Sequence, residues 1–94
     1  MKVLETRYRV DVEGHSDDRP FYRKDKEGVE TNWSLSGKRA SSVVHHLLDF
    51  GFSPMRIRVV GYASTRPMKE VKGKEGKALE RARAENRRVS LLIR

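Results

Sequence analysis

The sequence predicts a two-layer α/β fold of the α+β type, in which three strands form one sheet and two helices cover one face. Three segments alternate apolar and charged residues, the pattern of half-buried strands, and two segments between them repeat apolar residues at helical spacing. The predicted order is strand, helix, strand, helix, strand. Because 94 residues suit one small domain, we expect residues 1–94 to form a single domain.

The first predicted strand is marked by Tyr8, Val10 and Val12, which alternate with charged residues, and Gly14 ends it. The polar stretch 15–33 that follows has no sustained period. We therefore expect a long loop with a charged, solvated middle, since loops of this length are usually functional or mobile.

The stretch from Thr31 to Leu48 predicts a capped amphipathic helix that organises the rest of the chain. Ser36 is the expected N-cap, and Leu35 before it should pack back onto the first turn. Gly51 suits a left-handed cap at the other end. The apolar residues form one continuous helical face: Ala40, Val43, Val44, Leu47 and Leu48.

The second half of the chain predicts two more strands around a second helix. Ile57 and Val59 alternate with arginines, which indicates a strand over 56–61. A loop over 62–73 leads to a helix over 74–85, whose thin apolar face should pack shallowly. The last strand is marked by Val89, Leu91 and Ile93.

The charge of +8 lies mostly in the second half of the chain. The stretch 1–47 contains 9 basic and 8 acidic residues, whereas the stretch 48–94 contains 12 basic and 5 acidic residues. This favours a polyanionic partner such as nucleic acid, an anionic membrane surface or a cell wall. The absence of cysteine excludes disulfides and thiolate metal sites. No stretch has the length of a membrane span or the apolar core of a signal peptide, so export or membrane attachment would need segments outside this chain.

The stretch 14–20, GHSDDRP, is the first candidate for chemistry. His15 as a base, or His15 with Asp17 and Asp18 as metal ligands, is disfavoured, because the chain has no catalytic motif to complete such a site. Two alternatives remain open. The carboxylates either bond backbone amides in a turn, or they bind a ligand. We expect no enzyme activity, no metal and no cofactor.

Arg39 is the second candidate. It lies beside the apolar helix face near the helix start, where the helix dipole disfavours a cation. A carboxylate partner is therefore expected, either Asp17 or Asp18 in a salt bridge or the carboxylate of a ligand, which suits the planar guanidinium.

Four separated motifs resemble the OmpA-like C-terminal domain family. They are GHSDDRP (14–20), NWSLSGKRASSVVHHLL (32–48), RIRVVGYASTRP (56–67) and RARAENRRVSLLI (81–93). They match the family patterns GHTD, LSxxRA, GYGxxxP and NRRV in order. The tryptophan after Asn32 and the form of the first motif are similar to the flagellar motor stator B subunits (MotB-like) of that family. Ser16 replaces the usual threonine and Ala63 the frequent glycine.

The resemblance implies an OmpA-like sandwich with helices on one face of a mixed sheet, and non-catalytic binding of peptidoglycan. Asp17 would take the ammonium of diaminopimelate in the stem peptide, and Arg39 a carboxylate. Arg83 and Arg87 would contact the glycan or the peptide. The implied supporting residues are Ser16, Asn32, Ser36 and Asn86, of which Asn86 would order the helix-to-strand junction.

The resemblance also implies that the first strand and helix of the family are missing, because only residues 1–6 precede the first strand. We expect an open sheet edge, with homodimerisation through it or low stability in isolation. The implied role is to anchor a flagellar stator, porin or other membrane protein to the bacterial cell wall, in the periplasm or at the outer membrane. The alternative function, a basic nucleic-acid-binding module, is less favoured because the predicted strands expose no aromatic residues for base stacking.

Overall fold

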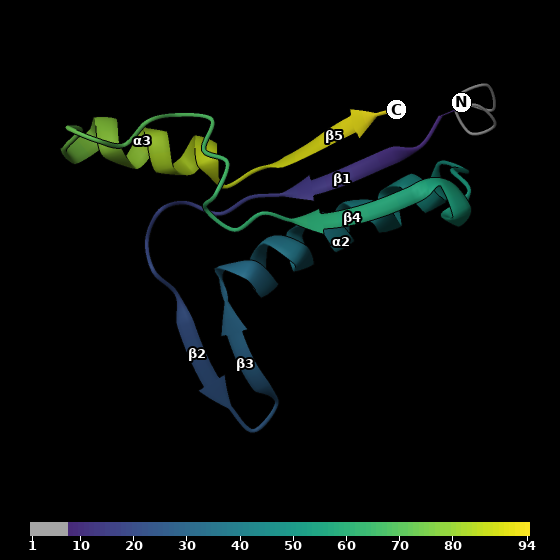
Figure 1. Ribbon diagram of the computed structural model, residues 1–94, viewed down its shortest axis with the longest axis horizontal. Coiled ribbons are helices and arrows are strands. Elements are labelled where there is room, and N and C mark those ends of the chain that lie inside the picture. The colour runs from purple at the N-terminus through teal and green to yellow at the C-terminus, as the bar shows by residue number, and fades with distance from the viewer. Residues whose placement is uncertain (1–7) are drawn as a thin grey trace.

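The computed structural model describes residues 8–94, so the expectation about residues 1–6 lies outside the described part. The predicted order of strands and helices is confirmed, with a hairpin added before the first helix (Figure 1). The elements are β1 (Val10–Gly14), β2 (Tyr22–Asp25), β3 (Gly28–Thr31), α2 (Asn32–Asp49), the short 3-10 helix η1 (Pro54–Arg56), β4 (Ile57–Gly61), α3 (Gly76–Asn86) and β5 (Val89–Ile93).

The main sheet is mixed and has the strand order β4-β1-β5. β1 runs parallel to β4 and antiparallel to β5, and Val12 lies opposite Val59 on one side and Leu91 on the other. One face of this sheet is covered by α2, which confirms the expected two-layer α/β fold. The core between the layers is small: Val10, Val12, Ala40 and Phe52 are buried in it, with Val43, Val44, Leu47, Ile57 and Val89 packed around them.

The N-terminal part of α2 approaches the sheet at a pair of glycines. Gly14 and Gly61 lie opposite each other at the ends of β1 and β4. A Cβ on Gly14 would lie 1.8 Å from the carbonyl oxygen of Ser36, and a Cβ on Gly61 would lie 2.9 Å from the Ser36 hydroxyl. Two residues without side chains therefore let the helix backbone rest directly on the strand ends.

The expectation that Ser36 caps the helix is wrong. The helix begins five residues earlier than a Ser36 cap would require, and Thr31 is its N-cap. The backbone N–H of Thr31 donates to the Ser34 hydroxyl at 2.8 Å, one half of a capping box. Ser36 is instead fully buried in the first turns, and its hydroxyl accepts from the backbone N–H of Ala63 at 3.1 Å.

The expectation of a loop over 15–33 is wrong in its second half, where β2 and β3 form an antiparallel hairpin. The hairpin projects away from the main sheet (Figure 1). Its turn is built by Asp25, whose carboxylate accepts from the backbone N–H of Glu27 at 2.9 Å, and by Gly28, which has a φ of 131°. Glu30 fastens the hairpin to α2 through an ion pair with Lys38.

α3 does not share the sheet face with α2, contrary to expectation. It lies beyond the end of the sheet, next to the start of β5 (Figure 1). Within α3 only Ala82 and Asn86 are buried, which agrees with the expected shallow packing. A helix with so little apolar surface gains too little from burial to displace water from the sheet. Neither α2 nor α3 is long and apolar enough to span a membrane.

Candidate ligand-binding site

An open pocket of about 280 Å³ lies between the end of β1, the start of α2 and the start of β5. Its position follows from the glycine contact, because that contact brings the loop after Gly14 beside the first turns of the helix. The pocket is lined by Ser16, Asp17, Arg19, Pro20, Phe21, Asn32, Leu35, Arg39 and Arg87. The structure thus brings three of the four predicted ligand-binding residues, Asp17, Arg39 and Arg87, to one place. Their role stays a prediction.

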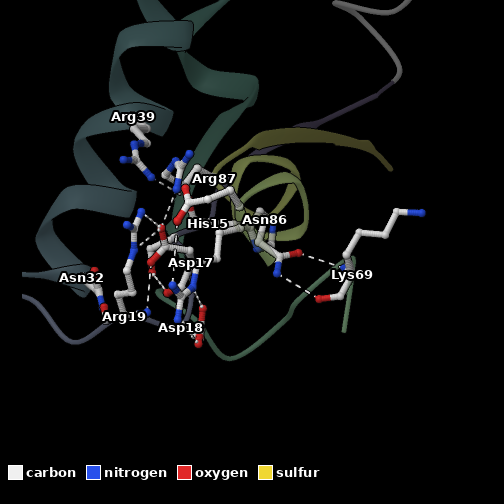
Figure 2. A network of polar contacts seen from close by, with 12 residues as sticks. His15, Asp17, Asp18, Arg19, Asn32, Arg39, Lys69, Asn86 and Arg87 are labelled. Carbon is white, nitrogen blue, oxygen red and sulfur yellow. Dashed lines mark hydrogen bonds and ion pairs between the residues drawn. The ribbon is translucent and has the colours of Figure 1, made fainter. Parts of the chain in front are cut away.

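Asp17 is the buried anion of this pocket, with 6% of its surface exposed. Its Oδ2 accepts from Nη2 and Nε of Arg19 at 2.7 and 3.2 Å and from Nη1 of Arg87 at 2.7 Å. Its Oδ1 accepts from the backbone N–H of Arg19 at 3.0 Å, as in an Asx turn. Asp17 therefore builds the turn that was one of the two alternatives, and it also lines the pocket (Figure 2). Ligand binding by Asp17, the other alternative, stays a prediction.

The carboxylate stays ionised at any ordinary pH. Burial raises the pKa of Asp17, but hydrogen bonds from Arg19 and Arg87 outweigh it and hold the pKa well below its usual range. With three arginines around one carboxylate, the pocket keeps an excess of positive charge. Such a pocket favours a ligand with a carboxylate or another anionic group.

Of the two alternatives for Arg39, a salt bridge to Asp17 or Asp18 is not formed within residues 8–94. Nη1 of Arg39 donates to the backbone carbonyl of His15 at 3.1 Å, and no described carboxylate lies within ion-pair distance of it. The guanidinium points toward Asp17 and Arg87 across the pocket (Figure 2). The remaining N–H groups of Arg39 are therefore available to a bound anion.

Arg83 lies outside the pocket lining. Its guanidinium pairs with Asp18, with Nε 2.8 Å from Oδ1. The pKa of Asp18 is lowered chiefly by this hydrogen bond. Arg83 therefore ties α3 to the loop after β1, and Arg87, one turn further along, reaches Asp17 in the same way.

The four predicted supporting residues take different places. Ser16 and Asn32 line the pocket, and the Asn32 side-chain amide donates to the backbone carbonyl of Arg19 at 2.8 Å. Ser36 lies in the contact between helix and sheet. Asn86 is buried at the end of α3, where it binds the backbone of Met68 and Lys69.

Sequence reasoning missed Arg19 and the apolar side of the pocket, formed by Pro20, Phe21 and Leu35. Arg19 was recognisable in principle, because an arginine two residues after an Asx-turn aspartate has its backbone N–H and guanidinium near the same carboxylate. The apolar residues gave no comparable indication, since their position depends on where the hairpin and the helix begin.

His15 is buried beneath the site, and both ring nitrogens lack a hydrogen-bond partner among residues 8–94. The ring stacks on Tyr62 with 5.4 Å between centroids. Burial lowers the pKa of His15, and the charge of Arg88 lowers it further. The unfolded chain therefore binds a proton more readily than the folded one, and stability falls as the pH drops below about 6.5.

Replacing His15 with phenylalanine is expected to flatten the pH dependence of stability between pH 7 and pH 5. The variant keeps an aromatic ring against Tyr62 and removes two unbonded nitrogens, so its free energy of unfolding at pH 7 should rise by up to about 1 kcal/mol. Urea unfolding at several pH values measures this. Below about pH 4 both proteins should weaken alike, because Asp11 and Asp17 have lowered pKa values. If the free energy of unfolding of the variant still falls from pH 7 to pH 5 as steeply as that of the wild type, another group controls this pH dependence.

Two sequence comparisons bear on this site. A family model described as "OmpA family" matches residues 1–81. An uncharacterized protein of Bacillus subtilis, YtxE, is 38% identical over 88 residues. That alignment covers 90% of this chain but 32% of YtxE, so the chain spans about a third of that relative.

Solved structures share the fold. The C-terminal domain of Helicobacter pylori MotB (residues 125–256) superposes with a TM-score of 0.73 at 23% identity, covering 99% of this chain and 64% of that one. A peptidoglycan-associated lipoprotein from Burkholderia pseudomallei superposes with a TM-score of 0.70 at 21% identity, covering 99% and 70%.

Proposed function

Because the chain belongs to the OmpA family, whose domains are non-enzymatic and bind peptidoglycan, we propose that it is a peptidoglycan-binding domain and that the Asp17 pocket holds the stem peptide. The supporting observation is Arg39, a pocket-lining arginine without a carboxylate partner among residues 8–94 and with donors directed at the space above Asp17.

The ligand we propose is the diaminopimelate of the stem peptide, which carries an ammonium and a carboxylate on one carbon. Arg39 is suited to the carboxylate, because its planar fork can donate two parallel hydrogen bonds. Arg87 lies next to it and adds a second positive charge. Asp17 is suited to the ammonium, since it is the one carboxylate of the pocket and stays ionised.

In the structure Arg19 occupies the place on Asp17 that the ammonium would take. Its side chain is 48% exposed, whereas that of Asp17 is 8% exposed, so the arginine is free to swing into solvent while the carboxylate stays fixed. The ligand ammonium would replace the Arg19 guanidinium, and Arg87 would remain. This exchange of one cation for another avoids leaving a buried charge unpaired.

Binding at one such site should be modest, because much of the ion-pair energy is already present in the free protein. A polymer held by several domains would gain strength through avidity. We therefore propose a structural role: residues 1–94 form one wall-binding domain that anchors a larger protein, such as a flagellar stator or another membrane protein, in the periplasm. Membrane attachment would come from segments outside this chain.

Co-sedimentation with purified diaminopimelate-type sacculi tests this function. Arg39→Ala and Asp17→Asn should each weaken binding about 10- to 100-fold, the value of one or two charge-assisted hydrogen bonds. Arg81→Ala is the matched control for Arg39→Ala, since Arg81 is exposed on α3 and its loss lowers the net charge by the same one unit. Circular dichroism must be unchanged. Equal binding by all variants, with release by high salt, would contradict the proposal and favour generic attraction to polyanions, including nucleic acid.

A third variant, Arg19→Ala, tests in the same experiment whether Arg19 competes with the ligand for Asp17. If Arg19 merely competes with the ligand for Asp17, its removal should leave binding unchanged or strengthen it several-fold. A loss as large as that of Arg39→Ala would show that Arg19 itself contacts the wall, and the proposed exchange on Asp17 would be wrong.

A further inference from the structure

A second pocket, of about 410 Å³, lies at the other end of β1 from the Asp17 pocket. The parallel pairing of β1 and β4 puts the start of both strands at this end, so Arg9, directly before β1, lines the pocket together with Met55 and Arg56 of η1. Four arginines line the pocket, together with one carboxylate, that of Asp11. They are Arg9, Arg56, Arg58 and Arg94.

Two of these arginines, Arg58 and Arg94, are already bound to the carboxylate of Asp11. Asp11 is 2% exposed, and its oxygens accept from Nε and Nη2 of Arg58 at 3.1 and 2.8 Å and from Nε of Arg94 at 2.9 Å. The hydrogen bond from Arg58 is the main reason why the pKa of Asp11 is lowered. The carboxylate is thus already neutralised and would not repel an anion approaching the pocket.

The other two arginines leave an excess of positive charge. Arg9 and Arg56 pair with no carboxylate among residues 8–94. The chain from residue 50 to residue 69 contains no acidic residue to balance them. The pocket therefore presents guanidinium groups for which the described part of the chain provides no partner, which favours an anionic surface.

Two exposed apolar side chains belong to the segment that leads into this end of the sheet. Met55, which lines the pocket, is 88% exposed, and Phe50 in the preceding turn is 73% exposed. Both belong to the segment between α2 and β4. Large side chains left this exposed on a small domain cost solubility unless something covers them. Arginines beside exposed Met and Phe form the combination found where proteins rest on a membrane, with apolar groups at the acyl boundary and cations at the headgroups.

We propose that this end of the domain docks on an anionic lipid surface. The lipid phosphates lie against Arg9 and Arg56, and Met55 and Phe50 enter the interface between headgroups and acyl chains. The exposed apolar residues favour a membrane over a soluble polyanion, which has nothing to bury them. Since this surface and the Asp17 pocket lie at opposite ends of β1, one domain is able to bind lipid and another ligand at once. The proposal does not depend on peptidoglycan binding.

The test is co-sedimentation of the 94-residue chain with vesicles of pure phosphatidylcholine and with vesicles containing about 30% phosphatidylglycerol, whose anionic headgroups give the surface a negative potential. One arginine near a charged membrane is worth about fivefold in affinity. The wild type should bind the anionic vesicles at least about tenfold more tightly than the neutral ones. Arg9→Glu with Arg56→Glu should lose at least about tenfold, while Lys77→Glu with Arg81→Glu, an equal charge change on α3, should lose under about threefold.

The variant Met55→Ser separates a membrane from other polyanions. It should weaken vesicle binding about threefold or more at high salt, where the apolar contribution dominates. Arg39→Ala should bind vesicles like the wild type, which distinguishes this surface from the wall-binding pocket. Absence of vesicle binding would overturn the proposal. So would an equal loss in the α3 pair, or release by soluble polyphosphate combined with no effect of Met55→Ser.

Discussion

The variant Gly14→Ala is expected to lose more than about 3 kcal/mol of its free energy of unfolding, the upper end for overpacking. An added Cβ would lie 1.8 Å from the carbonyl oxygen of Ser36 and 2.7 Å from its carbonyl carbon. These are backbone atoms of a helix held by its own hydrogen bonds, so no side-chain rotation relieves the clash. The strand and the helix must separate instead, which opens the core around Val12 and Ala40.

Gly37→Ala is the matched control for this prediction. It lies in α2 next to Ser36, and a Cβ there would meet no atom within 4 Å. Alanine in a helix interior is more stable than glycine by about 0.5–1 kcal/mol, so this variant should be more stable than the wild type. Urea unfolding followed by circular dichroism measures both. Similar midpoints for Gly14→Ala and the wild type would mean that the helix does not rest on the strand end as described.

The same contact determines the geometry of the binding pocket. Asp17 follows Gly14 by three residues, and Arg39 follows Ser36 by three residues. The distance between the strand end and the helix therefore determines how far Asp17 lies from Arg39. A partly folded Gly14→Ala protein should bind its ligand poorly even though both charged residues are intact.

The sequence was sufficient for the parts of the fold whose residues have one buried side. Val10 and Val12 in β1 and Ala40 in α2 are buried as expected, and Val43, Val44 and Leu47 are half-buried against them. Leu48, expected on the same helix face, is 38% exposed, because it lies at the end of the helix beyond the small core. The hairpin was missed because β2 is exposed along its whole length and thus has no apolar period. Its only local indications are the aspartate and the glycine of its turn, Asp25 and Gly28.

The candidate site was predictable to the extent that its residues belong to motifs. Asp17, Arg39 and Arg87 come from three different motifs, and the fold brings them to one pocket. Apart from Arg19, whose place two residues after the turn aspartate was recognisable, the pairing of arginines with carboxylates was not predictable. Asp17 has three arginines within the same pocket, and the choice among them depends on the turn at Arg19 and on the position of α3. Pairing of this kind is decided by distances of a few ångströms that spacing in the sequence does not determine.

Replacing Asn86 with alanine is expected to reduce the free energy of unfolding by about 2–4 kcal/mol, because this buried side chain makes three hydrogen bonds to backbone that are lost. Its Oδ1 accepts from the backbone N–H groups of Met68 and Lys69 at 2.9 and 2.8 Å, and its Nδ2 donates to the carbonyl of Lys69 at 2.9 Å. Asn86→Asp keeps the acceptor Oδ1 but places a second oxygen where Nδ2 donates to the Lys69 carbonyl, so it should also lose stability. Glu85→Ala, at an exposed neighbouring position, should change stability by less than about 0.5 kcal/mol.

Amide hydrogen exchange at Met68 and Lys69 separates this mechanism from general unfolding. Both amides should exchange faster in Asn86→Ala under conditions where β1 stays protected. The position of Arg87 depends on this junction, because α3 has little apolar packing of its own, and Arg87 directly follows Asn86. The alanine variant should therefore also weaken sacculus binding, by less than Arg39→Ala. Continued protection of the two amides would mean that the loop is held by other contacts, and a link from Asn86 to the pocket would then have no physical basis.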